Sequence, residues 1–360
     1  MPAASLSENA TLRIPVRNRG GVPASGVAAV TLNVTVTDTT ADSFLTVYSG
    51  SNRPLASSLN WTAGKTVANL VEVAVNSDGT VSVYNAAGRV DVVVDVEGWT
   101  STSGTVAGTD GLYQPVTPAR ILDTRTGTGR VGPGQSINVQ VAGAGDFPLQ
   151  GAEAVVLNVT ATDATEPSYL TVYPTGSQPP TSSNLNFAAG MTVPNRVMVG
   201  LGTGGQVTIV NGAGWVNIVV DGSGWYTDRS AISANIGRMS ALAPDRILDT
   251  RGGNGAPQGR LGQQATMTVQ VAGRGGVPAM TSTTPPSAVI INVTATDGSA
   301  SSYLAAYPGV VRPGVSDLNW TRGETRPNLV VVKLAPDGTI TIYNALGSVD
   351  VVGDVVGWFN

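Results

Sequence analysis

Apolar and polar residues alternate with a period of two over several short segments of this chain. In residues 29–36, Val and Leu side chains alternate with Ala, Thr and Asn, and residues 90–99 show the same alternation. A period of two matches the two faces of a β-strand, whereas a helix would repeat every 3.6 residues. Asp-Gly pairs, at 78–79 and 337–338, lie between such segments and favour tight hairpins. The pattern predicts an all-β chain of short antiparallel strands.

The strand pattern occurs three times along the chain, with the same motifs in the same order. The heptapeptide Leu-Asn-Val-Thr-Val-Thr-Asp at 32–38 returns, slightly changed, at 157–163 and 291–297. The copies lie about 130 residues apart, which is the size of a domain and far longer than a solenoid turn. We therefore expect three homologous antiparallel β-sandwiches with a jelly-roll-like topology. They could follow one another in tandem or pack about a pseudo-threefold axis.

The motifs and the composition between them set the expected boundaries. Segments rich in Ser, Thr and Gly, without an apolar period, separate the copies and are typical of linkers. The expected division is repeat 1 (1–100), a linker (101–118), repeat 2 (119–226), a second linker (227–244) and repeat 3 (245–360).

One motif breaks the threefold pattern. The block Arg-Ile-Leu-Asp-Thr-Arg opens repeats 2 and 3, at 120–125 and 246–251, but repeat 1 lacks it. If the block is an integral strand, one sheet has an unpaired edge, which favours strand addition from another chain. If the block is peripheral, or if the chain is part of a longer protein, its absence has no such consequence. Both interpretations stay open.

Composition excludes several classes of function. The chain contains no His and no Cys, which excludes Ser-His-Asp catalysis, thiolate chemistry, disulfides and His or Cys metal sites. The net charge is −4, and the cationic residues are scattered, so we expect no nucleic-acid partner. No apolar stretch is long enough for membrane insertion. We expect a protein that is not an enzyme and uses no metal and no cofactor.

Carboxylates on the last strand of each repeat are the remaining candidates for catalysis. Asp91 and Asp95 share one strand face, about 13 Å apart, which is too far for a glycosidase pair. We expect instead that Asp95, Asp221 and Asp354 accept hydrogen bonds or pair with an arginine of the Arg-Ile-Leu-Asp-Thr-Arg block.

Asparagines beside an aromatic residue recur in every repeat and form the candidate ligand-binding set. Amide groups can bind sugar hydroxyls while an aromatic ring stacks on the sugar. Asparagine also fixes turns and backbone, which is the alternative explanation for its recurrence. The candidate residues are Asn60, Trp61, Asn69, Asn186, Phe187, Asn195, Asn319, Trp320 and Asn328.

The combined motifs resemble a known family. They are similar to a tandem β-sandwich repeat of secreted and cell-surface actinobacterial proteins. The motifs that carry the resemblance are Arg-Ile-Leu-Asp-Thr-Arg, Leu-Asn-Val-Thr-Ala-Thr-Asp, Tyr-Leu-Thr-Val-Tyr-Pro, Ser-Asn-Leu-Asn-Phe and a closing Asp-Val-x-Gly-Trp. There it often accompanies peptidases, amidases or glycoside hydrolases as a non-catalytic appendage. The resemblance covers nearly the whole chain outside the linkers. It implies an extracellular, non-enzymatic β module.

These observations lead to two hypotheses about function. The first is a non-catalytic extracellular surface or adhesion module that binds glycan or a cell-wall polymer. The alternative is a structural subunit of an extracellular fibre, phage tail or injection particle, assembled through its β-repeats with copies of itself or fibre partners. The N-terminus lacks the charged and apolar regions of a secretion signal, which would also suit a virion or injection-particle component.

Overall fold

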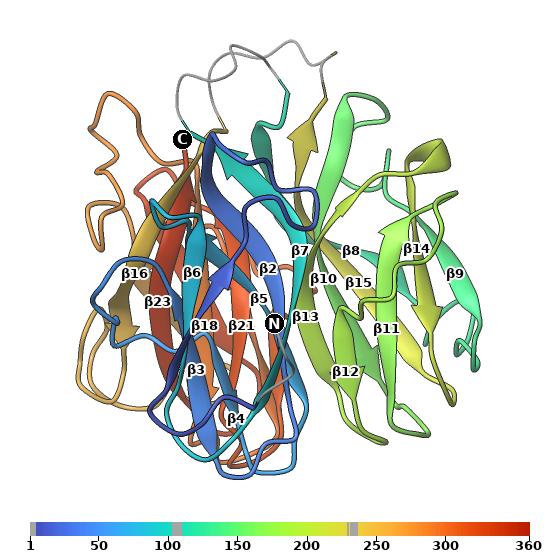
Figure 1. Cartoon of the computed structure of the whole chain (residues 1–360), viewed down its shortest axis with the longest axis horizontal. Coiled ribbons are helices and arrows are strands. Elements are labelled where there is room, and N and C mark those ends of the chain that lie inside the picture. The colour runs from blue at the N-terminus through green and yellow to red at the C-terminus, as the bar shows by residue number, and fades with distance from the viewer. Residues whose placement is uncertain (1–4, 103–109, 229, 231–236) are drawn as a thin grey trace.

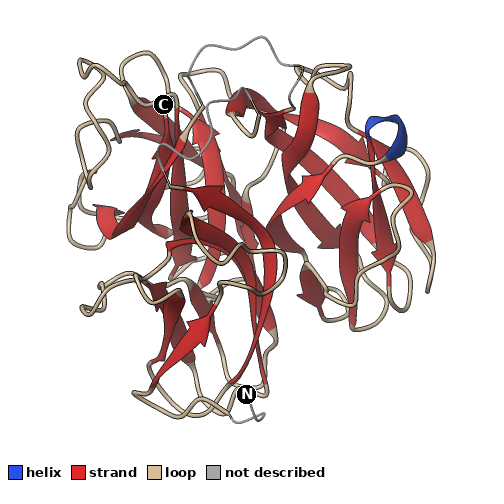
Figure 2. Cartoon of the chain, turned by 45° about the horizontal axis from the view of Figure 1, so that its top comes forward, coloured by secondary structure: helices blue, strands red, loops and turns tan. Residues whose placement is uncertain are grey.

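The computed structural model describes residues 5–102, 110–228, 230 and 237–360, and this part of the chain is built of β-strands. Apart from one short 3-10 turn, η1 (Thr203–Gly205), every regular element in these ranges is a strand (Figure 2). The prediction of an all-β protein is confirmed.

Each sequence repeat supplies an equivalent series of strands. Repeat 1 forms β1 (Thr11–Pro15), β2 (Val27–Thr37), β3 (Ser43–Tyr48), β4 (Leu59–Trp61), β5 (Val67–Ala74), β6 (Thr80–Asn85) and β7 (Asp91–Ser101). Repeat 2 forms β8 (Tyr113–Asp123), β9 (Ser136–Gln140), β10 (Ala152–Thr162), β11 (Ser168–Pro174), β12 (Leu185–Phe187), β13 (Val193–Gly200), β14 (Gln206–Asn211) and β15 (Asn217–Thr227). Repeat 3 forms β16 (Met239–Asp249), β17 (Thr266–Gln270), β18 (Ala288–Thr296), β19 (Ser302–Tyr307), β20 (Leu318–Trp320), β21 (Arg326–Lys333), β22 (Thr339–Asn344) and β23 (Asp350–Phe359).

The described strands form six antiparallel sheets, two from each repeat. The outer sheets have the orders β1-β6-β3-β4, β9-β14-β11-β12 and β17-β22-β19-β20. The inner sheets, which contact one another, have the orders β5-β2-β7, β13-β10-β15-β8 and β21-β18-β23-β16. The Arg-Ile-Leu-Asp-Thr-Arg blocks begin within β8 and β16, the edge strands of two inner sheets. Repeat 1 has no such strand among its described residues, so its inner sheet ends at β7.

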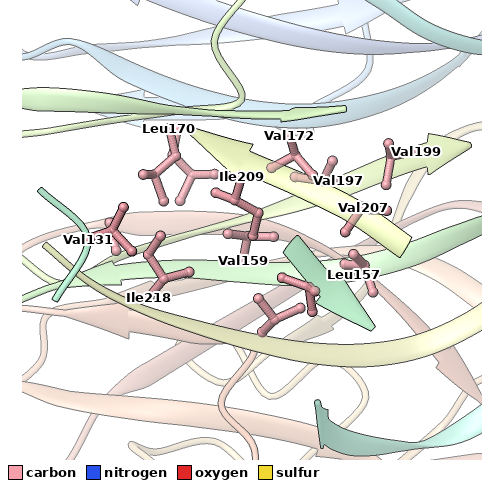
Figure 3. Close-up of a cluster of buried hydrophobic side chains, with 14 of the residues drawn as sticks. Val131, Leu157, Val159, Leu170, Val172, Val197, Val199, Val207, Ile209 and Ile218 are labelled. Carbon is pink, nitrogen blue, oxygen red and sulfur yellow. The ribbon is translucent and has the colours of Figure 1, made fainter. Parts of the chain in front are cut away.

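A hydrophobic cluster lies between the two sheets of each repeat. In repeat 2, Leu157 and Val159 from the inner sheet meet Leu170 and Ile209 from the outer sheet (Figure 3). All four are fully buried, as the alternation in the sequence predicts for residues on one strand face. Repeats 1 and 3 bury equivalent clusters of their own.

A further hydrophobic cluster joins the three repeats at a shared centre. It contains Leu70 of repeat 1, Val156 of repeat 2 and Leu329 of repeat 3, together with stacked rings of Tyr113 and Phe359 at 4.2 Å. Strands β5, β13 and β21 meet there, as Figure 1 shows near its middle. The repeats are therefore packed around one centre and are not independent domains joined by flexible linkers.

Two expected linkers are shorter than the sequence suggested. Strand β8 starts at Tyr113 and β16 at Met239, both inside the segments 101–118 and 227–244. A composition rich in Ser, Thr and Gly, without an apolar period, made these segments look like linkers. Strand β8 accepts Pro115 and Pro118 because it is an edge strand, where a residue without an N–H breaks no ladder. Residues 103–109, 229 and 231–236 of these segments lie outside the described residues.

Candidate functional site

Asparagines on the inner sheets form a buried hydrogen-bonded ring at the junction of the three repeats. Each repeat contributes one asparagine from its long middle strand and one from the strand beside it. The side-chain amide of Asn195 donates to Oδ1 of Asn33 at 2.9 Å, that of Asn328 to Asn158 at 3.0 Å, and that of Asn69 to Asn292 at 3.0 Å. Every one of these bonds crosses from one repeat to another.

The same middle-strand asparagines also bind the backbone of a neighbouring repeat. Asn33 donates to the carbonyl of Ser183 at 2.8 Å, Asn158 to that of Ser316 at 2.7 Å, and Asn292 to that of Ser57 at 2.7 Å. Repeat 1 thus bonds repeat 2, repeat 2 bonds repeat 3, and repeat 3 bonds repeat 1. The contacts close into a ring, and the amides that could have bound a ligand hold the repeats together.

The predicted ligand-binding residues are close together in each repeat, but most of them are buried. Asn69, Asn195 and Asn328 are each only 1% exposed and belong to the ring. The half-buried members, Asn60, Asn186 and Asn319, bond to serine hydroxyls three residues earlier in their own loops.

The aromatic members of the set, Trp61, Phe187 and Trp320, are buried in the hydrophobic clusters of their own repeats. The two indole N–H groups donate to backbone carbonyls, those of Ala41 and Ala300. A sugar could stack on these rings only if a repeat opened. The arrangement matches the alternative explanation, in which recurrent asparagines fix the backbone.

Arg196 on β13 belongs to the junction of the repeats, and the recurring sequence motifs did not predict it. It is fully buried, where repeats 1 and 3 have Leu70 and Leu329. Its guanidinium donates to Oδ1 of Asp317 at 2.6 Å and to Oγ of Ser223 at 2.6 Å, so an ion pair ties repeat 2 to repeat 3. Two departures from the repeat pattern could have predicted this ion pair. Repeat 2 has an arginine where the other repeats have leucine, and repeat 3 has Asp317 where the others have Ser58 and Asn184.

The boundary between repeats 1 and 2 uses a glutamate in place of this ion pair. Glu97 accepts a hydrogen bond from the side-chain amide of Asn184 at 2.6 Å and one from the backbone N–H of Met198 at 2.8 Å. Burial raises the pKa of Glu97 to about 7, although these two hydrogen bonds act in the opposite direction. The glutamate therefore changes its protonation state near neutral pH.

The boundary between repeats 3 and 1 contains a crevice. Its lining includes Glu72, Ser58, Asn292, Asp354 and Val356, and its volume is about 10 Å³. That is close to the space of one water molecule and far too small for a sugar. Burial raises the pKa of Glu72 to about 7, and the hydroxyl of Thr31, which donates to it, only partly offsets this effect.

The two edge strands that carry the Arg-Ile-Leu-Asp-Thr-Arg block each bring an arginine to a buried carboxylate. Arg120 Nε lies 2.5 Å from Asp221 Oδ1, and Arg246 Nε lies 2.8 Å from Asp354 Oδ1. The prediction that Asp221 and Asp354 pair with an arginine of the block is confirmed. Burial nevertheless raises the pKa of both carboxyls, because desolvation exceeds the effect of the arginine.

Asp95, the counterpart in repeat 1, departs from this prediction. Its carboxylate has no hydrogen bond or ion pair within the described chain, because no described edge strand brings an arginine to β7. Partial burial raises the pKa of Asp95, with no cation to counter it. The expectation that each of these carboxyls accepts a hydrogen bond or pairs with an arginine was therefore wrong for Asp95.

The described residues hold no group of three or more acidic side chains that could bind a metal ion. Within the same residues, no helix has the length and apolar character to cross a membrane.

Comparisons with known proteins give little further information. No family model matches the chain, and no curated protein matches it. Two similar solved structures are a chain described under the triple jelly roll fold and turret assembly of an archaeal virus, with a TM-score of 0.23, and one from Sulfolobus turreted icosahedral virus, with a TM-score of 0.20. In both cases the identity is 10%, and the match covers 99% of this chain and 84% of the other. A likeness at this level carries no argument about function.

Proposed function

We propose that this chain is a non-catalytic structural module that serves as a rigid subunit of an extracellular fibre or a virion-type particle. In this proposal, each repeat is a jelly-roll-like β-sandwich, and the three are locked into one block. The observation that carries it is the ring of buried amides: the polar residues that recur in every repeat bond the repeats to one another. The groups best suited to hold a ligand are already engaged.

Physical reasoning supports a rigid block. Hydrogen bonds buried away from water are strong, and a network of them accepts few alternative arrangements. The junction adds a buried ion pair, which favours one register of repeat 2 against repeat 3 because either charge alone would be unfavourable there. A subunit of a fibre or particle needs a fixed geometry of this kind, so that contacts with its neighbours recur in the same orientation.

Light scattering across a range of concentrations, together with a glycan array, tests the proposal. A structural subunit should form defined oligomers or filaments as concentration rises and should show no saturable binding to glycans. A chain that stays monomeric at every concentration and binds a glycan saturably would overturn the proposal in favour of a surface receptor.

The second candidate function, glycan binding at a cell surface, has one observation in its favour. The outer sheets of repeats 1 and 3 each carry an aromatic pair with an arginine above one ring. Arg53 lies 4.0 Å from the centre of Tyr84, and Arg312 lies 4.2 Å from the centre of Tyr343. Tyr84 is partly exposed, and a tyrosine on a sheet face can stack on a sugar, whereas Tyr343 is buried. Saturable glycan binding that is lost in Tyr84→Ala would support this function.

A further inference from the structure

Strand β7 is the edge strand of the inner sheet of repeat 1, whereas the equivalent strands of repeats 2 and 3 lie inside their sheets. In those repeats, β15 and β23 lie between two partners, whereas β7 pairs with β2 on one side and with no other described strand. The side chains show the difference. Val93 on β7 is 48% exposed, while its counterparts Val219 and Val352 are each 4% exposed.

Repeats 2 and 3 show what the first arginine of the block does. It pairs with the carboxylate of the last strand, and its outer nitrogen reaches across to a loop of a neighbouring repeat. Arg120 Nη2 donates to the carbonyl of Gly314 at 3.0 Å, and Arg246 Nη2 donates to that of Leu55 at 3.4 Å. The block therefore also helps to join one repeat to another.

The remaining residues of the block close the core and anchor the strand end. Ile247 and Leu248 are buried in the cluster of repeat 3, and Ile121 and Leu122 pack against that of repeat 2. The threonine hydroxyl accepts the backbone N–H of the opposite strand, at 2.9 Å for Thr124 and 3.0 Å for Thr250. The aspartate of the block binds both of its arginines, as Asp123 does.

Repeat 1 presents the partners of all these groups without the block itself. Asp95 stands where Asp221 and Asp354 receive their arginine. Val92, Val94 and Val96 are only partly buried at the margin of its core. Their counterparts at the first two positions, Ile218 and Val220, are fully buried. The loop carbonyl that corresponds to those of Gly314 and Leu55 is that of Thr181.

We propose that the open edge of β7 binds an extended strand with the sequence Arg-Ile-Leu-Asp-Thr-Arg by antiparallel strand addition. By the register of β8 on β15, its arginine lies opposite Asp95 and its leucine opposite Val94. The backbone supplies ladder hydrogen bonds, and the Ile-Leu pair and the arginine supply selectivity. This inference rests on the proposed structural role and names the chemistry of the partner.

The two blocks of this sequence do not fill the edge, because both are paired within the chain as β8 and β16. A symmetric pairing of β7 with β7 of a second copy, centred on Asp95, would bring two aspartates together without a cation, which is unfavourable. A strand with the sequence of the block instead brings an arginine to Asp95.

Fluorescence anisotropy with a labelled peptide that copies residues 114–126 of this chain tests the proposal. We expect saturable binding, and hydrogen exchange should show new protection of the amides in residues 91–101. The Arg120→Ala peptide, and separately the Asp95→Asn protein, should each weaken binding about tenfold, because a charge-assisted hydrogen bond is lost. The Asp337→Asn protein, which changes an exposed turn carboxylate in repeat 3, is the control and should bind like the unchanged chain.

Each outcome separates the edge assignment from the structural role. No binding, or binding that Arg120→Ala and Asp95→Asn leave unchanged, overturns the edge assignment even if the chain forms oligomers. If the chain forms dimers in which residues 91–101 are protected and the peptide no longer binds, the edge is occupied by a second copy of the chain, and the edge assignment is overturned. Selective peptide binding by a chain that is otherwise a monomeric glycan binder supports the edge assignment and overturns the structural role.

Discussion

At the scale of single residues, the junction depends on how buried charges are balanced. Arg196 is the largest fully buried side chain of the described molecule, and it bonds Asp317, Ser223 and the carbonyl of Leu329. Its sequence context predicts a strand correctly but says nothing of a partner 121 residues away. Oδ1 of Asn328 has no hydrogen bond, and the equivalent oxygens of Asn69 and Asn195 accept from Leu329 and Leu70. The ring is therefore least regular where the arginine enters.

Replacement of this arginine by the leucine of the other repeats should be harmful because of Asp317. In Arg196→Leu, the aspartate stays buried without its cation, which should lower the free energy of unfolding by about 3–5 kcal/mol. The double variant Arg196→Leu/Asp317→Asn should recover most of the loss. An asparagine occupies this position in repeat 2, where Asn184 Oδ1 accepts the N–H of Val172. Urea unfolding of both variants checks this, and equal losses would contradict it.

The buried glutamate of the crevice should make stability fall as pH rises. The pKa of Glu72 is about 7 in the folded chain against 4.5 for an ordinary glutamate. Between these values the folded state holds a proton that the unfolded state has lost, so its stabilisation is full below pH 4.5 and lost on the way to pH 7. Glu72→Gln should flatten the dependence between pH 5 and 8 by up to about 3 kcal/mol. Parallel stability curves for the two proteins, from urea unfolding at each pH, would refute this.

At the scale of elements, the edge strands decide how well each inner sheet is closed. The alternation of apolar residues predicted the strands around 29–36 and 90–99, which match β2 and β7. It could not predict β8 to its full length, because the first half of this strand has no regular apolar alternation. Nor could it orient the asparagine and aromatic set. Its members Asn69, Asn195 and Asn328 are buried because other repeats cover them, and the packing of repeats leaves no local period in the sequence.

Truncation of the core residue that the block supplies should test whether the edge strand is integral. Leu248 of β16 is fully buried, so Leu248→Ala should lower the free energy of unfolding by about 2–5 kcal/mol. Leu149→Ala, in an exposed loop of repeat 2, is the matched control and should change stability by less than about 0.5 kcal/mol. Thermal or urea unfolding measures both. A small effect of Leu248→Ala would mean that the block is peripheral.

At the scale of the whole molecule, three copies of one pattern meet through boundaries that differ from one another. A hydrogen bond between Glu97 and Asn184 joins repeats 1 and 2, and an ion pair between Arg196 and Asp317 joins repeats 2 and 3. The boundary between repeats 3 and 1 has Ser58 and Val356 and keeps the crevice. A homo-trimer would have three identical boundaries. Within one chain each boundary can carry its own polar pair, which specifies which faces meet.

Loss of one ring asparagine should weaken two repeats at once. Asn158 donates to the carbonyl of Ser316 and accepts from Asn328, so Asn158→Ala leaves both groups of repeat 3 without that partner. The expected loss is about 1–3 kcal/mol. Hydrogen exchange should quicken in residues 316–333 of repeat 3 as well as in β10. Asn186→Ala, whose bonds stay within repeat 2, is the control and should leave repeat 3 unchanged. If Asn158→Ala affected repeat 2 alone, the ring would not couple the repeats, and the case for one rigid block would fail with it.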